Sequence, residues 1–169
     1  MSTKGYVKFW GVRGSNPTPD KNKMEYGGDT SCVEVRTSDN ELIILDMGSG
    51  IRNLGNEILS DSSSPKTIHI FLSHFHWDHI MGFLYFTPFY DKSYTFNIYG
   101  FNKHTETTSF SDKILDPTFW PVSMDMLTAK INFYNQNLNQ NLGYIVKNNI
   151  IIEKFLTKFK NLKNINYYS

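Results

Sequence analysis

The sequence contains a single cysteine, Cys32, among its 169 residues. One thiol excludes an intramolecular disulfide. The formal net charge of +1 argues against a general nucleic-acid-binding protein, because a basic surface would dominate the charge of such a protein. No apolar stretch approaches the length of a transmembrane helix, and the first residues lack the apolar segment of a signal peptide. We therefore expect a soluble cytoplasmic protein.

Histidine and aspartate are missing from the last part of the chain. No histidine follows His104 and no aspartate follows Asp125, whereas asparagine occurs ten times between Ile131 and Ser169. Residues 146–169 contain five lysines and one glutamate, and apolar residues recur there at helical spacing. This pattern predicts a basic amphipathic helix over residues 146–169. Docking of that helix on its own domain is favoured over a role at a membrane surface or on a partner.

What the sequence does contain is enough apolar material for one core, with 40% hydrophobic and 15% aromatic residues. β-Forming runs bounded by turn residues predict strands over Tyr6–Val12, Cys32–Arg36, Leu42–Leu45, Ile68–Leu72 and Tyr94–Gly100. The first three are spaced as an antiparallel meander. Apolar spacing predicts helices over Ile51–Leu59, over about Asp78–Phe86 and, with a thin apolar face, over Thr105–Leu115.

The most informative stretch is Ser73–His79. It holds three of the five histidines and one aspartate within six residues, after a buried strand and before an apolar segment. A tight loop in that position can bring several imidazoles to one point. Imidazole and carboxylate are suitable ligands for zinc, manganese or iron. A solvated or accidental histidine run is the alternative, but His-x-His-x-Asp-His matches a complete ligand pattern.

This loop resembles the signature of the metallo-β-lactamase-fold hydrolases, in which two metal ions share such a loop. The resemblance implies that His74 and His76 hold the first metal and that Asp78 and His79 hold the second. It also implies that Asp78 orients the nucleophilic water. The expected cofactor is zinc in a two-metal site, with manganese or iron as the other possibilities.

Three earlier blocks are similar to one branch of this superfamily, that of ribonuclease Z and the cyclic-nucleotide phosphodiesterases. They are Phe9–Ser15, Gly27–Cys32 and Leu45–Gly50. Members of that branch usually carry asparagine where Asp29 stands. Asp46 matches an acidic residue that supports the metal loop, although a turn or helix N-cap aspartate is an equal alternative. Asp116–Val122 resembles a segment that flanks the substrate cleft in the family.

The fold class implied is α/β: a metallo-β-lactamase-like αββα sandwich with its N-terminal half present and its C-terminal half incomplete. Residues 1–145 would form this partial domain and residues 146–169 the basic helix. Leu142–Ile145 resembles the segment after the family's third histidine, and that alignment places Asn137 at the histidine position. The bridging aspartate is also missing, so the resemblance implies a truncated chain. His69 and His104 are predicted to be structural or solvated.

The function implied is that of a metal-dependent hydrolase of phosphodiesterase type, acting on a phosphodiester or nucleotide-like small molecule. Two metal ions would activate a water and neutralise charge on the phosphate. Two alternatives remain: an inactive truncated remnant that at most binds metal, and a non-catalytic interaction module. Because ligands are missing, we expect weak metal binding and phosphodiester hydrolysis near background. An uncovered apolar sheet face also predicts self-association.

Overall fold

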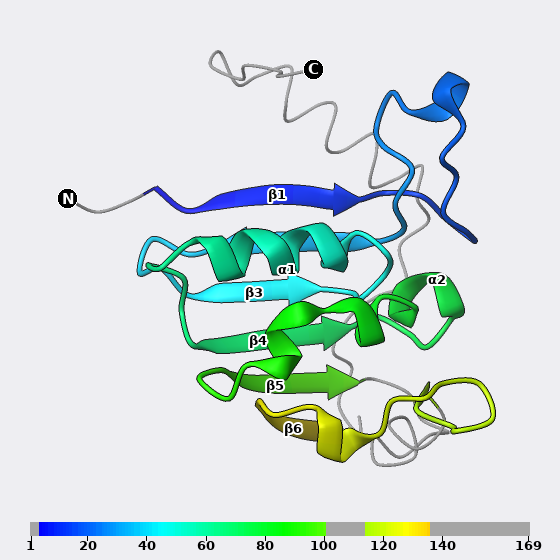
Figure 1. The fold of residues 1–169 in the computed structure, drawn as a ribbon. Coiled ribbons are helices and arrows are strands. Elements are labelled where there is room, and N and C mark those ends of the chain that lie inside the picture. Colours follow the sequence, from blue (N-terminus) through cyan, green and yellow to red (C-terminus); the bar gives the residue numbers. More distant parts are fainter. Residues whose placement is uncertain (1–3, 101–113, 136–169) are drawn as a thin grey trace. The chain divides into compact units, whose positions relative to one another are not determined.

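A single mixed sheet of six strands, in the order β1 to β6, forms the frame of the domain (Figure 1). The computed structural model describes residues 4–100 and 114–135. The strands are β1 (Tyr6–Gly11), β2 (Cys32–Arg36), β3 (Leu42–Leu45), β4 (Thr67–Leu72), β5 (Thr95–Gly100) and β6 (Lys130–Asn135). Strands β1, β2 and β3 pair antiparallel, and β3 to β6 pair parallel. The predicted opening meander is therefore confirmed.

The change from antiparallel to parallel pairing occurs between β3 and β4, where α1 (Ile51–Ser60) makes the crossover. Neighbouring parallel strands need such a crossover, because a tight turn reverses the chain direction and can join only antiparallel strands. Ile51, Leu54 and Ile58 are buried on one side of α1, so the predicted amphipathic helix is confirmed. The helix ends at Ser60, directly before the polar segment Asp61–Pro65.

One face of the sheet carries the core. Alternate residues of the central strands are fully buried, as expected when successive side chains point to opposite faces. The buried apolar set from β3, β4 and β5 comprises Leu42, Ile44, Ile68, Ile70, Leu72, Phe96 and Ile98. Figure 1 shows α1 crossing in front of β2 and β3, with short helical turns in front of β4 and β5.

The opposite face carries half-buried aromatic side chains. Tyr99 stacks on Phe71 at 4.6 Å and on Tyr134 at 4.9 Å between ring centroids. The Nδ1 atom of His69 lies 3.2 Å from the Tyr99 hydroxyl, which agrees with the structural role predicted for this histidine. Nothing in the described residues tests the self-association predicted for this face, which stays a prediction.

The helix predicted over Asp78–Phe86 is wrong over most of its length. The chain forms only α2 (Trp77–Ile80), followed by the 3-10 turns η2 (Phe83–Tyr85) and η3 (Thr87–Tyr90). Backbone bonds to a distant residue replace the next helical turn: Met47 N donates to His79 O at 2.7 Å, and Gly82 N donates to Met47 O at 2.9 Å. The helix therefore ends where these backbone groups bond the loop after β3, residues Asp46–Gly50, which we call the β3 loop.

Strand β6 was not predicted, because the polar composition from Lys130 onward obscured the alternation of Ile131 and Phe133. It completes the parallel part of the sheet, where Asn132 Nδ2 donates to Asn97 Oδ1 at 3.0 Å. The other predictions for this end of the chain lie outside the described residues: most of the Thr105–Leu115 helix, His104, Asn137 and the helix over 146–169. No helix within 4–100 or 114–135 is long and apolar enough to cross a membrane.

Candidate metal centre

Four segments of the chain meet beyond the carboxyl ends of β3 and β4, where Figure 1 places α2. They are the loop after β1, the segment before β2, the β3 loop and the stretch Ser73–His79, which we call the histidine loop. Two glycines permit this close approach. A Cβ on Gly48 would lie 2.5 Å from the Asp78 carbonyl oxygen and 2.6 Å from that of Ser31. A Cβ on Gly82 would lie 2.2 Å from the Gly48 carbonyl oxygen. Since backbone cannot move aside as a flexible side chain can, both positions fix the histidine loop against the β3 loop.

Asp46 is the support of the histidine loop. Its φ of 62° is in the left-handed region, which aspartate tolerates better than most residues, and its side chain is buried. Oδ1 accepts hydrogen bonds from the backbone N and the Oγ of Ser73, both at 2.8 Å. Oδ2 lies 2.8 Å from Nδ1 of His79 and accepts from Ser31 Oγ at 3.2 Å. Helix α1 begins after Gly50, so the N-cap alternative for Asp46 is wrong.

The ring of His74 contacts the rings of the other two histidines of the loop. The ring centroid of His74 lies 4.4 Å from that of His76 and 4.1 Å from that of His79. A carboxylate accepts but does not donate, so the short contact with Asp46 is a hydrogen bond when His79 Nδ1 carries the proton, and in the neutral ring this leaves the lone pair on Nε2. His74 Nδ1 lies 3.0 Å from Ser73 Oγ. Bonding of one ring nitrogen to an oxygen is the usual way to orient a metal-binding histidine.

Burial lowers the pKa of His74, and the neighbouring His79 and His76 lower it further. A proton on this ring would be poorly solvated and repelled by two other imidazoles. His74 is therefore held in the neutral form, which is the form that binds a metal ion.

Asp78 is held from the opposite side by the loop after β1. Its Oδ2 accepts from the backbone N of Ser15 at 2.9 Å and lies 3.5 Å from His79 Nε2. The Ser15 hydrogen bond is the main cause of a lowered Asp78 pKa, so the carboxylate is ionised at neutral pH. Asp78 is thus a fixed anion beside Nε2 of His79.

The structure brings together all four residues predicted as ligands, but not as a finished site. Across the described ranges, no group of three or more His, Cys, Asp or Glu side chains is arranged so that it could hold a metal ion. The residue types nevertheless fit a transition metal, because imidazoles with an anchored Nδ1 stand beside an ionised carboxylate. The arrangement therefore supplies residue types that suit a metal ion, without the geometry of a complete site.

Several partners around the loop were missed by sequence reasoning. Ser73 and Ser31 bond Asp46, and the backbone of Ser15 bonds Asp78; a serine gives no signal of such a role in a sequence. Asp29, in the position where asparagine was expected, accepts from Ser49 Oγ at 2.7 Å and from Asn53 Nδ2 at 3.2 Å. Asp29 therefore joins the β3 loop to α1 and does not contact the histidines.

The segment predicted to flank a cleft, Asp116–Val122, contacts the histidine loop through Trp120. The Trp120 ring stacks with that of Trp77 at 6.5 Å between centroids and meets Tyr85 edge-on at 6.1 Å. Trp77 stands between His76 and Asp78 in the sequence. The aromatic contact was also missed, although a tryptophan within a ligand run could have signalled it.

Similar proteins are found among family models and among solved structures. Residues 26–94 match the model of the metallo-beta-lactamase superfamily. The structure is similar to a diphosphatase from the PhnP family, with a TM-score of 0.50, 16% identity, and coverage of 79% of this chain and 51% of that one. Human tRNase Z, short form (ELAC1), has a TM-score of 0.48, with 19% identity and coverage of 79% and 47%. Unliganded yeast PDE1 has a TM-score of 0.44, with 17% identity and coverage of 83% and 53%. A comparison with curated proteins found no match.

The predicted resemblance to metallo-β-lactamase-fold hydrolases is confirmed, and so is the α/β fold class. The family match spans Gly27–Cys32, Leu45–Gly50 and the histidine loop, which are three of the stretches that carried the resemblance. The chain spans about half the length of the solved structures that it matches.

Proposed function

We propose that this chain, with its metallo-β-lactamase-type fold, binds a divalent transition metal through His74, His76, Asp78 and His79 and acts as a metal-dependent hydrolase of phosphodiesters. The observation that carries the proposal is the Asp46 network. A buried carboxylate bonds both Ser73, which precedes the first histidine, and Nδ1 of His79, the last histidine of the loop. A solvated histidine run would not need a buried anion to fix the orientation of its rings.

The chain's own residues would contribute orientation and a fixed charge. When bound, the metal ions would lower the pKa of a water molecule and neutralise charge on the phosphate. Asp46 would hold the His79 ring so that Nε2 faces the ion. Ser15 bonds only Oδ2 of Asp78, so Oδ1 would be the atom that accepts a hydrogen bond from the attacking water. Zinc suits this mixture of imidazole and carboxylate best, with manganese or iron as alternatives.

A second candidate function is metal binding without turnover. It is favoured by the finding that the described residues hold no complete group of three ligands. Hydrolysis depends on a nucleophile held within a fraction of an ångström of its attack position, so a loosely bound ion would lower the rate by orders of magnitude. The third possibility, an interaction module based on the C-terminal helix, rests on residues outside the described part.

Metal content is the first test. Purified protein is loaded with zinc, dialysed and analysed for metal, beside a His74→Ala/His76→Ala variant. His69→Ala is the matched control, because His69 lies on the opposite sheet face and bonds Tyr99. We expect zinc in the wild type and the control and at least about a tenfold weaker affinity in the double variant. Equal and negligible zinc in all three proteins would overturn the proposal.

Hydrolysis separates the two candidate functions. Bis-p-nitrophenyl phosphate and a cyclic nucleotide serve as substrates, with zinc or manganese present. Metal-dependent turnover that Asp78→Ala abolishes would support the hydrolase. Stoichiometric metal with turnover at background would support metal binding alone.

A further inference from the structure

Three aromatic rings form a surface directly beside the histidine loop. We name Trp77, Tyr85 and Trp120 the aromatic platform. Trp120 contacts both other rings, at 6.5 Å from Trp77 with 24° between planes and at 6.1 Å from Tyr85 with 82° between planes. Trp77 is 49% exposed and Tyr85 is 52% exposed. The platform therefore offers open aromatic surface and is not part of the core.

The contrast with the neighbouring phenylalanines supports this distinction. Phe83, Phe86 and Phe89 belong to the same stretch of chain as Tyr85, and all three are fully buried against the sheet. None of the platform rings is among the buried core residues of the described chain. Large aromatic side chains that remain exposed next to a polar site are typical of a binding surface.

The platform is also held in position by its backbone. In the turn that presents Trp120, the N–H groups of Phe119 and Trp120 donate to the Asp116 carbonyl oxygen at 2.9 and 3.1 Å. Thr118 N donates to Asp116 Oδ1 at 2.8 Å. Further along, Thr128 Oγ1 donates to the Tyr90 carbonyl oxygen at 2.6 Å, which fastens the segment to the domain. Aromatic rings that are already fixed before a ligand binds lose little conformational entropy on binding.

Trp77 is the covalent neighbour of two of the proposed ligands, His76 and Asp78. Consecutive Cα atoms are about 3.8 Å apart, so the platform begins within one residue of the proposed reaction centre. A group attached to a phosphate at the histidine loop would therefore lie within reach of the platform.

We infer that the aromatic platform stacks the base of a nucleotide whose phosphate is bound at the histidine loop. The inference rests on the proposed function and adds to it a separate binding surface for the base. Aromatic side chains stack on all bases, because every base has a π-face, so the platform would not select one base. Stacking on one aromatic side chain changes the affinity for a base by about five- to a hundredfold.

The test measures binding, not turnover. Dissociation constants of AMP and ribose 5-phosphate are measured by calorimetry with zinc-loaded protein, and adenosine is added with a chelator present. Ligand-detected NMR reports whether magnetisation reaches the base protons. The variants are Trp120→Ala and, as an independent second change, Tyr85→Ala; Trp120→Phe is the conservative replacement. Phe9→Ala is the control, since Phe9 is 66% exposed on β1.

We expect AMP to bind at least about fivefold more tightly than ribose 5-phosphate. Trp120→Ala and Tyr85→Ala should each remove most of that difference, while Trp120→Phe and Phe9→Ala keep it. Adenosine should bind without metal, so a failure of the metal proposal leaves this arm intact. Equal binding of AMP and ribose 5-phosphate, or an unchanged AMP affinity in both alanine variants, would overturn the inference.

Discussion

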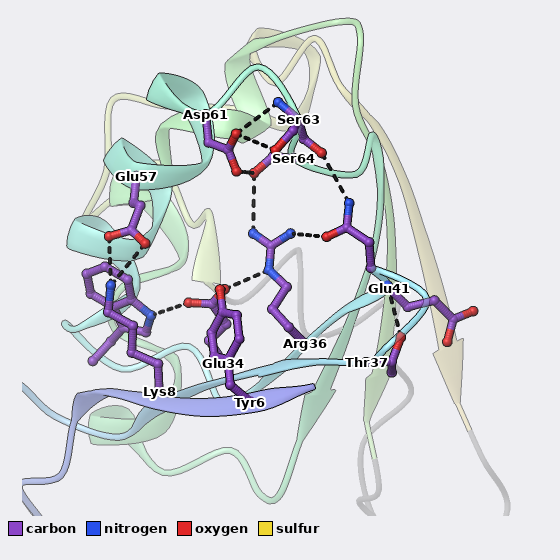
Figure 2. Close-up of polar contacts among 12 residues, drawn as sticks. Tyr6, Lys8, Glu34, Arg36, Thr37, Glu41, Glu57, Asp61, Ser63 and Ser64 are labelled. Carbon is purple, nitrogen blue, oxygen red and sulfur yellow. Dashed lines mark hydrogen bonds and ion pairs between the residues drawn. The ribbon is translucent and has the colours of Figure 1, made fainter. Parts of the chain in front are cut away.

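Two polar clusters in this domain are each built around a buried carboxylate, but the groups that bond the carboxylate differ. The first is the ion-pair cluster, Glu34 and Arg36 with the side chains that bond them, drawn in Figure 2. The carboxylate of Glu34 accepts from Tyr6 Oη at 3.0 Å, from Trp10 Nε1 at 2.9 Å and from Arg36 Nε at 2.7 Å. Arg36 also donates to Ser64 Oγ at 3.3 Å. Both charged side chains are buried, and both have partners from the fold itself.

The second cluster is the histidine loop, at the opposite end of the β2–β3 pair. Its buried member, Asp46, is bonded as fully as Glu34. The imidazoles are less buried: His74 and His79 are half-buried, His76 is exposed, and the His74 ring contacts both others. In the ion-pair cluster the buried charges are paired with each other and with neighbouring side chains. In the histidine loop the buried carboxylate instead orients the imidazoles that we propose as metal ligands.

Removal of Glu34 should give the largest loss of stability. Glu34→Ala leaves the guanidinium of Arg36 buried without its counter-ion, which typically costs about 3–5 kcal/mol. Urea unfolding of the wild type and variant measures the change. Lys8→Ala is the control, because the Lys8–Glu57 pair is 42% and 48% exposed, and such a pair contributes about 0–1 kcal/mol. A loss below about 1 kcal/mol for Glu34→Ala would mean that the two clusters do not differ in this way.

Removal of the charge of Asp46 should instead weaken the binding of zinc. Asp46→Asn keeps a side chain that tolerates the left-handed backbone, but the anion that bonds His79 Nδ1 is lost. We expect zinc affinity to fall about 10- to 100-fold, as measured by competition with a chromogenic chelator.

Asp29→Asn is the matched control for that change. Asp29 also bonds polar side chains of the β3 loop and α1, but it touches no imidazole. We expect its zinc affinity to equal that of the wild type. Equal effects of the two substitutions would show that Asp46 acts on the fold alone.

Local pattern was sufficient for much of this structure. β2, β3 and α1 follow directly from alternation and helical spacing, and the histidine loop follows from ligand spacing. Contacts between distant residues explain the failures: α2 ends where Gly82 meets Gly48, and β6 depends on pairing with β5. The choice of the buried face of strand β2 also depends on contacts between distant residues. Hydrophobicity alone would bury Val33 and Val35, yet the fully buried face carries Glu34 and Arg36, because their partners come from β1 and from the segment after α1.

The smallest expected effect comes from Tyr6, at the edge of the ion-pair cluster. Partial burial raises the Tyr6 pKa, and the hydrogen bond to Glu34 raises it further. Folding therefore favours the neutral phenol. Its contribution is fully present below the unfolded pKa of about 10 and is lost as the pH rises through the higher folded pKa. Because Tyr6 is 47% exposed, Tyr6→Phe should cost only about 0.5–1 kcal/mol at pH 7.

The decisive measurement for Tyr6 is the difference in unfolding free energy between wild type and Tyr6→Phe at pH 7 and at about pH 11, above the ordinary tyrosine value. Other tyrosines titrate in both proteins, so the difference isolates Tyr6. Tyr90→Phe serves as the control, since burial alone raises the Tyr90 pKa and no carboxylate bonds its hydroxyl among the described residues. We expect the Tyr6 difference to shrink toward zero at high pH. A difference that stays constant with pH would show that the phenol packs against Glu34 without bonding it, and the ion-pair cluster would then be less complete than its geometry indicates.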